Sequence, residues 1–516
     1  MDKIAADTSV AEALRRAPHA RQIFDRHGLK GCGGEHGPAE PISFFAALHQ
    51  VDLAPLLREL NQEVQAPQQT YTYTEGPADV IYRRFFKAAI VIALSVGCMW
   101  GAINLLQIAL RGSFLQLSLL PAIHAHAQAM ISGFVGLFVM GFAYQSFPRF
   151  KNTTLWRPEL AVLSFYFLML GVAARIIAEL IAPLPACMFF GIVGFGLEML
   201  AGIAFVTVLM KTARQSIGPR APYELFIIGS LFWFLVQIPL SYLLYFAKVL
   251  AANQEQAVMR IALIDGPLRD VQLLGFAALI IAGVSQRFVP AVYGLRPPAH
   301  DRLKAIFWLI NGSLILNVAS YVSLLLTFDP LFEIPLEISY LLMPVWAVLL
   351  IRQIGVFRPP ERRDRSFKFI RAAYVWLLIS AVMLPLFPLY SALTHQLFAH
   401  SWMGAYRHAF TVGFISMMIL GVSSRVVPIL SGIDGAKLTP LWGPFILLTV
   451  GNAGRVSLQV LTDWFPSTAY SLVGLTGFIE VVGLAWWGVH LWRTMDLAGA
   501  HRPQSLTIKL PAQAVR

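Results

Sequence analysis

Three histidines at the beginnings of two apolar segments are the residues best suited to hold a metal. His124 and His126 begin segment 119–147, and His408 begins segment 402–428. Neutral imidazole binds metals, and haem iron is a natural target for two axial histidines from facing helices. Residues two apart on a helix point roughly 200° apart, so His124 and His126 cannot bind one iron from the same helix face. We expect one to pair with His408 across a cofactor and the other to face a neighbouring group. The alternative is that lipid headgroups wet all three histidines at the outer membrane interface.

Two arginines inside apolar segments need partners. Arg175 and Arg455 lie within apolar stretches, where a charged side chain is costly and marks a functional position by default. Their partners are either carboxylates of this chain, for which Glu179, Glu198 and Glu480 are the candidates, or an anionic cofactor group such as a haem propionate. The sequence leaves both pairings open.

The composition indicates a membrane protein. The chain of 516 residues is 57% hydrophobic and 13% charged, whereas soluble domains are about 45–50% apolar and about 25% charged. Apolar runs of about 20 residues can cross a bilayer as helices. This pattern excludes a soluble enzyme, a disordered chain and a fibrous repeat. We expect twelve spans, near residues 85–110, 119–147, 158–182, 186–210, 223–250, 265–290, 303–328, 332–354, 368–393, 402–428, 440–464 and 468–492.

One motif recurs in the second, sixth and tenth of these segments. It consists of Gly-Phe, a second glycine eight residues after the first, and a proline seven residues later. Helix packing through small residues explains the presence of glycine but not this constant spacing. We therefore predict an all-α fold of three parallel four-helix repeats. The three copies are Gly133-Phe134, Gly141 and Pro148; Gly275-Phe276, Gly283 and Pro290; and Gly413-Phe414, Gly421 and Pro428.

The repeat register relates the candidate site residues to one another. His408 aligns with Gln128 and Asp270, and Arg175 and Arg455 align with Asn317. The fourth helix of each repeat carries one acid in a more loosely matching position: Glu198, Glu337 and Glu480.

The basic residues predict the orientation in the membrane. After residue 75, 26 Lys and Arg residues lie before the first segment, in every second loop or after the last segment, and the remaining loops and segment ends hold five. Positively charged loops face the cytoplasm, so both termini are expected there. This bias accounts for the net charge of +12 without a nucleic-acid partner. The lipid bilayer is the partner that the sequence predicts.

The expected domains follow from the same pattern. Residues 1–65 are polar enough for a small helical cytoplasmic domain, 66–82 for a linker, 83–495 for the membrane domain and 496–516 for a cytoplasmic tail. The sequence does not specify a protein partner of the N-terminal domain.

The motifs around the histidines resemble the NnrS family. The resemblance rests on His124-Ala-His126 leading into Gly133-Phe134 and on the run from His408 to Arg425, and it covers roughly residues 80–495. This family comprises twelve-helix membrane proteins with haem and copper, linked to nitric oxide and denitrification. The resemblance implies a bacterial inner-membrane protein in which His126 or His124 pairs with His408 across a b-type haem.

A more distant similarity connects the chain to the catalytic subunits of haem-copper oxidases and nitric oxide reductases. Those proteins keep copper-binding histidines on helices six and seven, whereas the corresponding segments here have none and Asp270 stands at the repeat position. A copper centre of the oxidase type is therefore not expected.

The N-terminal region resembles the module that precedes iron–sulfur-cluster repair di-iron proteins. The matching stretches are 24–34 and 56–61. That family often has paired cysteines, but only Cys32 occurs here, as the residue after Gly31. Cys32 is either a site of thiol chemistry or partner docking, or a plain loop residue.

The sequence thus predicts a haem-binding membrane protein that acts in the response to nitric oxide. It leaves open whether the chain is an enzyme, binds nitric oxide or passes electrons. If both axial ligands are histidine, the iron has no vacant position, which favours electron transfer or sensing. The alternatives are a cofactor-free secondary transporter of a small solute and an assembly factor for denitrification enzymes.

Overall fold

The computed structural model describes residues 3–63, 76–114, 117–216, 221–295, 298–360, 364–396 and 399–500. Within these residues every regular element is a helix. The predicted linker and tail lie partly outside them, at 64–75 and 501–516. Four short helices form the N-terminal part: α1 (Val10–Arg16), α2 (Arg21–Arg26), α3 (Ile42–His49) and α4 (Leu53–Glu63).

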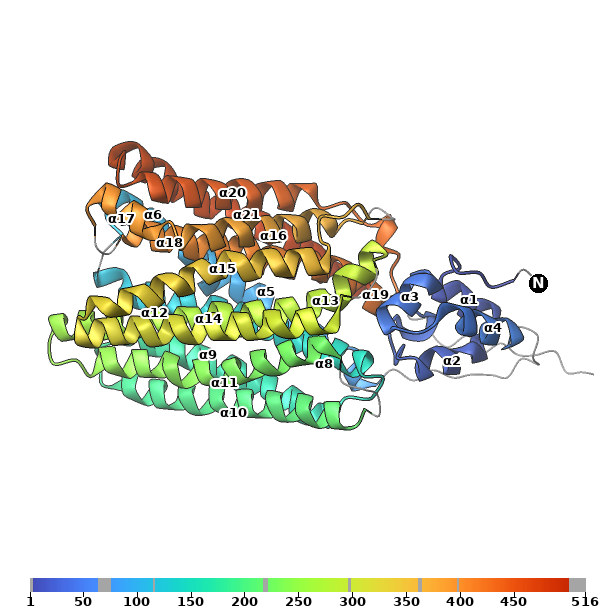
Figure 1. The fold of residues 1–516 in the computed structure, drawn as a ribbon. Coiled ribbons are helices and arrows are strands. Elements are labelled where there is room, and N and C mark those ends of the chain that lie inside the picture. Colours follow the sequence, from blue (N-terminus) through green and yellow to red (C-terminus); the bar gives the residue numbers. More distant parts are fainter. Residues whose placement is uncertain are drawn as a thin grey trace, which may run out of the picture.

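The remaining helices are long and run side by side (Figure 1). They are α5 (Ile81–Ile92), the π-helical segment η4 (Ala93–Gly97) and α6 (Cys98–Arg111); α7 (Leu120–Gln128), η6 (Ala129–Gly136) and α8 (Leu137–Phe150); α9 (Pro158–Ile181); α10 (Ala186–Arg214); α11 (Pro222–Val249); α12 (Gln254–Asp270), η7 (Val271–Ala278) and α13 (Leu279–Tyr293); α14 (His300–Thr327); α15 (Glu333–Ile354); α16 (Phe367–Met383); α17 (Phe387–Thr394); α18 (His400–His408), η9 (Ala409–Ser416) and α19 (Met417–Ser431); α20 (Trp442–Leu461); and α21 (Pro466–Ala500). We call α5–α10, α11–α15 and α16–α21 the first, second and third groups.

In the described part of the chain, ten helical stretches are long and apolar enough to cross a membrane. There are eleven if α16 and α17, which meet at a bend of 57°, form one span. The chain is therefore a multi-pass membrane protein. The expected span at 440–464 is present as a helix, α20, but it is not among the ten. Its polar residues Asn452, Arg455 and Gln459 lower its mean hydropathy.

The three helices with the glycine motif lie at the centre of the bundle. Of their most apolar stretches, 78%, 94% and 72% is buried, against at most 56% in any other candidate span. Each contains a π-helical segment at the same register, from four residues before the first glycine of the motif to three residues after it. π-Helical turns are rare, so this coincidence supports the repeat. The inner helices are Leu120–Phe150, Gln254–Tyr293 and His400–Ser431.

Both glycines of each motif allow an inner helix to touch the first long helix of its own group. A Cβ atom on the first glycine would lie 2.4–2.8 Å from a side chain of that helix, and on the second glycine 2.6–3.1 Å. The contacted residues are seven apart in every group, so the packing repeats along with the sequence. They are Phe85 and Ile92, Phe226 and Trp233, and Phe369 and Trp376.

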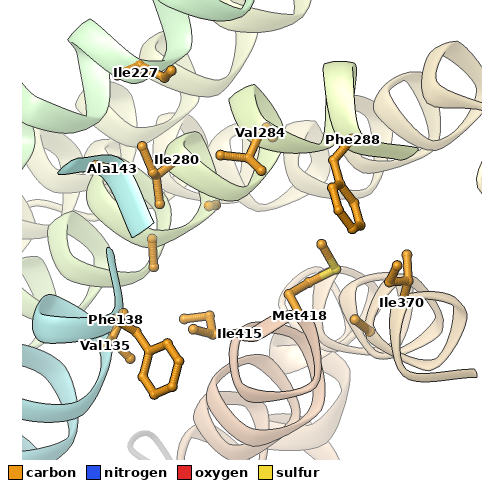
Figure 2. Packing of buried hydrophobic residues seen from close by; sticks show 14 of the residues in the cluster. Val135, Phe138, Ala143, Ile227, Ile280, Val284, Phe288, Ile370, Ile415 and Met418 are labelled. Atoms are coloured by element: carbon orange, nitrogen blue, oxygen red, sulfur yellow. The ribbon is translucent and has the colours of Figure 1, made fainter. Parts of the chain in front are cut away.

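Apolar side chains fill the space where the inner helices meet. Figure 2 shows Ile280 and Val284 of α13 facing Ile415 of η9 and Met418 of α19, with Phe138 of α8 beside them. Burial of such side chains is the main favourable contribution to packing. Apolar side chains therefore line the axis of the bundle at this level.

The N-terminal helices lie at one end of the bundle, next to α13 and α19 (Figure 1). We call this the near end, and we call the opposite end, where α7 and α18 begin, the far end. Ser9 caps the N-terminus of α1, since its side chain accepts a hydrogen bond of 3.1 Å from the Glu12 backbone N–H.

The glycine contacts predict the effect of one methyl group. In Gly413→Ala the new Cβ would lie 2.4 Å from Trp376, and we expect a loss of stability of about 1–3 kcal/mol because the core becomes overpacked. Thermal unfolding in detergent measures this loss. The control is Gly196→Ala, because a Cβ there meets nothing within 4 Å and alanine favours a helix over glycine. Equal melting temperatures for both variants would contradict the packing argument.

Candidate functional site

The candidate site lies at the far end, where the first and last groups meet. There α6 packs against α7 and α21, and α18 packs against α20. The His126 Nδ1 lies 2.9 Å from the backbone carbonyl oxygen of Gly97. A Cβ on Gly101 would lie 2.5 Å from the His126 ring, so glycine at this place in α6 makes room for the imidazole.

His408 reaches the same region from the third group. Its Nδ1 lies 3.2 Å from the backbone carbonyl oxygen of Gly404, one turn earlier in α18. His126 and Arg455 both contribute to the electrostatic environment of His408. The structure therefore places His126, His408 and Arg455, three of the five predicted site residues, in one region at the far end.

The hydrogen bonds of these two histidines decide which ring nitrogen can bind a metal. A carbonyl oxygen only accepts, so Nδ1 carries the proton in both His126 and His408. Nε2 then presents its lone pair. Metal-binding histidines usually donate their other ring N–H in this way, which fixes the tautomer and the ring orientation.

His124 lies elsewhere and in a different hydrogen-bonding state. It is buried, and its Nδ1 lies 3.1 Å from the Lys248 Nζ and 3.8 Å from a carboxylate oxygen of Glu179. An ammonium group donates, so the Nδ1 of His124 accepts and Nε2 carries the proton. His124 and His126 thus face different neighbours, as their spacing predicts.

Arg175 belongs to the surroundings of His124. Its guanidinium donates to Glu179 at 2.6 Å and lies 4.1 Å from the centre of the Tyr245 ring. Glu179 also accepts from Lys248. Internal ion pairing, one of the two partners expected for a buried arginine, is therefore present at Arg175.

The acid of the first group is also fully engaged. Glu198 accepts hydrogen bonds from the Gln128 amide at 2.8 Å and from the Tyr242 hydroxyl at 2.8 Å. Gln128 is the residue that aligns with His408. In the first group, side chains of the protein itself therefore supply the hydrogen-bond partners of the buried acid.

The third group has the same framework but lacks these partners. Gly171 packs against Glu198, and Gly451 packs against Glu480 in the same way. Four residues after each glycine come Arg175 and Arg455. The two arginines and the two acids therefore occupy corresponding places in their groups.

Several buried polar atoms in the third group have no hydrogen-bond partner among the described residues. Arg455 has two such nitrogens, Nε and Nη1, and Glu480 has one such oxygen, Oε1. Burial of an unpaired charge is strongly unfavourable. The arrangement is therefore suited to a ligand with anionic and polar groups. On the same helix as Arg455, both polar atoms of the Asn452 amide and the amide oxygen of Gln459 also lack such a partner.

Two sequence differences explain why the third group stays open. Glu179, which neutralises Arg175, corresponds to the uncharged Gln459. Tyr242, which donates to Glu198, has no matching donor at Oε1 of Glu480 among the described residues. Close to Glu480, Gly477 of α21 packs against Ala102 of α6, where a Cβ on the glycine would lie 2.9 Å from the Cα atom of Ala102. A small residue therefore occupies this part of α6, and Arg455 lies 5.6 Å from the centre of the Phe114 ring.

In the second group, the acid of the fourth helix does not pair with the residue that aligns with the two arginines. Asn317 donates to Ser339 at 3.2 Å, so Ser339 stands opposite the residue that aligns with the arginines. Glu337 lies two residues earlier and is partly exposed. Asp270 lies in the electrostatic environment of Arg407 and Asp265.

Within the described residues, no group of three or more His, Cys, Asp and Glu side chains lies together as a metal site. His126 and His408 can supply two ligands, which suffices for a metal whose other ligands belong to a macrocycle.

The membrane helices match a known protein family. A family model described as NnrS protein matches residues 80–496. The chain belongs to the NnrS family. The NnrS match spans the helices from α5 through almost all of α21 and ends short of the N-terminal helices. No curated protein matches the chain.

Sequence reasoning missed the amides around Arg455. Asn452 and Gln459 lie three residues before and four residues after Arg455, which places them on its face of the helix. The spacing of three and four residues from Arg455 was the signal in the sequence that pointed to these two amides. Lys248 gave no comparable signal, because a lysine at a helix end usually extends to the membrane surface.

Replacing Glu179 and Glu480 by glutamine should change the stability of the protein to different extents. Glu179→Gln leaves Arg175 and Lys248 without their carboxylate, and removal of one partner from a buried ion pair costs about 3–5 kcal/mol. The variant should therefore unfold at a lower temperature in detergent than the unmodified protein. Glu480→Gln is the matched comparison, because Oε1 of Glu480 accepts no hydrogen bond among the described residues and only the electrostatic interaction with Arg455 would be lost. A loss in Glu480→Gln as large as that in Glu179→Gln would contradict this assignment.

Proposed function

We propose that this chain is an NnrS-type haem protein of the bacterial inner membrane and acts in the response to nitric oxide. The observation that carries the proposal is the pairing of two Nδ1-anchored histidines with a buried, unpartnered arginine at one place. His126 and His408 would be the axial ligands of a b-type haem. Arg455 would bind a propionate.

The residues present fit such a group. The orphaned nitrogens of Arg455 are suited to a carboxylate, because a guanidinium and a carboxylate form charge-assisted hydrogen bonds. The carbonyl oxygens of Gly97 and Gly404 accept from the two histidine rings, and Gly101 makes room for the His126 imidazole, so both rings are held with Nε2 free to bind a metal.

The contrast between the groups supports one haem for each chain. In the first group, Gln128, Tyr242 and Glu198 bond to one another in the place that corresponds to the open one. The second candidate histidine of α7, His124, is tied to Lys248. We therefore assign neither His124 nor Arg175 to the cofactor, although the sequence leaves both possible.

A haem held by two histidines would carry electrons and would bind nitric oxide only where one histidine gives way. The chain's own residues hold the imidazoles in their ligating tautomer, and the surrounding apolar helices exclude water. This arrangement favours electron transfer or nitric oxide sensing over turnover. A copper centre of the oxidase type is not part of the proposal, because the positions that would require histidine lack it.

The proposed topology is twelve spans in three parallel repeats, with α16 and α17 as one span and α20 as another. Both termini would face the cytoplasm, which places the near end inside the cell and the candidate site close to the outer face. The excess of basic loops supports this orientation. The apolar lining of the axis disfavours the transporter alternative, since these side chains offer a polar solute no hydrogen-bonding groups (Figure 2).

The histidines give the first test of the proposal. Purified protein expressed with adequate haem should show a Soret band typical of two histidine ligands. His408→Ala and His126→Ala should each abolish or shift this band because each removes an axial ligand. His124→Ala is the control on the same helix and should leave the band position unchanged. No Soret band in the unmodified protein, or a shift in His124→Ala alone, would sink the ligand assignment.

Arg455 gives an independent test. Arg455→Ala should weaken haem retention about 10–100-fold, the effect of losing one hydrogen bond between charged groups. Arg455→Lys keeps the charge and should retain more haem than Arg455→Ala. Haem titration of the haem-free protein measures both. Equal affinities for the unmodified protein and Arg455→Ala would show that no carboxylate binds there.

Nitric oxide gives the functional test. Its addition to the reduced protein should change the visible spectrum slowly, because a histidine must first dissociate. His126→Ala with retained haem should respond faster, since one axial position is then open. An absence of any spectral change in both proteins would argue against nitric oxide binding and leave electron transfer.

A further inference from the structure

The N-terminal helices form a small unit with its own apolar core. Val10 of α1, Phe24 of α2, Ile42 and Phe45 of α3 and Leu60 of α4 are all at most 4% exposed. The rings of Phe24 and Phe45 meet edge to face at 5.3 Å. We call residues 3–63 the cap, because they cover the near end of the inner helices (Figure 1).

Each of the three inner helices contributes one arginine to the contact with the cap. The guanidinium groups bind backbone carbonyls in two cases and a carboxylate in the third. The contacts are Arg149 Nη2 to the Lys30 carbonyl oxygen at 2.6 Å, Arg287 Nε to the Leu48 carbonyl oxygen at 2.6 Å, and Arg425 to Glu40. The cap therefore bridges all three groups of helices.

The surroundings of Arg287 and Arg425 differ from those usual for arginines at the ends of membrane helices. At the ends of apolar segments both would be expected to extend toward lipid headgroups. Arg287 is instead 5% exposed, and Arg425 lies between Glu40 and Asp364, with 2.7 Å to the latter.

Cys32 lies inside the contact. Its Sγ is 3.8 Å from the backbone carbonyl oxygen of Ile429 in α19. The backbones also meet closely, since a Cβ on Gly432 would lie 2.7 Å from the Gly33 carbonyl oxygen. Burial raises the pKa of the Cys32 thiol to about 11, so the seated thiol is protonated and unreactive at neutral pH.

The named cap contacts are mostly charge-assisted hydrogen bonds. Phe24 and Phe45 pack within the cap, whereas the ring centre of Phe44 lies 4.7 Å from the guanidinium carbon of Arg425. Polar contacts between domains of one chain behave like transient interfaces. We propose that the cap is a reversible cover, held at the near end by Arg149, Arg287 and Arg425, and that its release exposes Cys32. This inference does not depend on haem.

The experiment measures the accessibility of Cys32 in the full-length protein. A maleimide is added to the native protein in detergent, and peptide mass spectrometry follows the modification of Cys32 separately from Cys98 and Cys187. In the native protein Cys32 should react at least about a hundredfold more slowly than in SDS-unfolded protein, because modification must wait for opening. A native rate equal to the unfolded rate would overturn the proposal.

The variants test whether the arginines hold the cap. Arg287→Ala combined with Arg425→Ala should speed modification about tenfold or more, since hydrogen bonds between charged groups are lost. Glu40→Gln changes only the cap and should also speed it, which covers the case in which the double variant misfolds. Arg371→Ala is the control, because Arg371 binds the Arg358 carbonyl within the membrane domain. Unchanged slow modification in all variants would show that Cys32 is protected by the fold of the cap itself.

Discussion

A guanidinium group buried among apolar helices needs an anionic partner, and this requirement organises the membrane domain. The first group meets it internally, with Glu179 beside Arg175. The third group keeps the arginine but replaces the acid by Gln459. Glu480 lies in the electrostatic environment of Arg455, but two nitrogens of Arg455 have no hydrogen-bond partner among the described residues. In the proposed function a haem propionate would supply that partner.

Much of the fold could be predicted from the sequence because hydrophobic runs and glycine spacing are local signals. Gly133, Gly275 and Gly413 mark helices that the structure places at the centre. The separation of His124 from His126 followed from helix geometry alone. Which histidine faces His408 could not be predicted, because that depends on Lys248 and on the Gly97 carbonyl, which lie on other helices.

Other features escaped prediction for similar reasons. The sequence already shows that Glu337 matches the repeat loosely, but only the structure shows that Ser339 is the hydrogen-bond partner of Asn317. The burial of Arg287 under the cap depends on the Leu48 carbonyl, more than 200 residues away in sequence. Contacts between residues so far apart along the chain produce no periodic pattern in the sequence. The resemblance of the N-terminal region to an iron–sulfur repair module stays a prediction.

The candidate site combines a residue of α7, early in the chain, with residues of α18, α20 and α21 near its end. His126 is made early, whereas His408, Arg455 and Glu480 are made near the end. Until the ribosome has passed residue 480 and the final helices have entered the bilayer, half of the candidate site does not exist. Loading of any ligand there must therefore be a late event in biogenesis, and a bound ligand fastens the earliest part of the membrane domain to the latest.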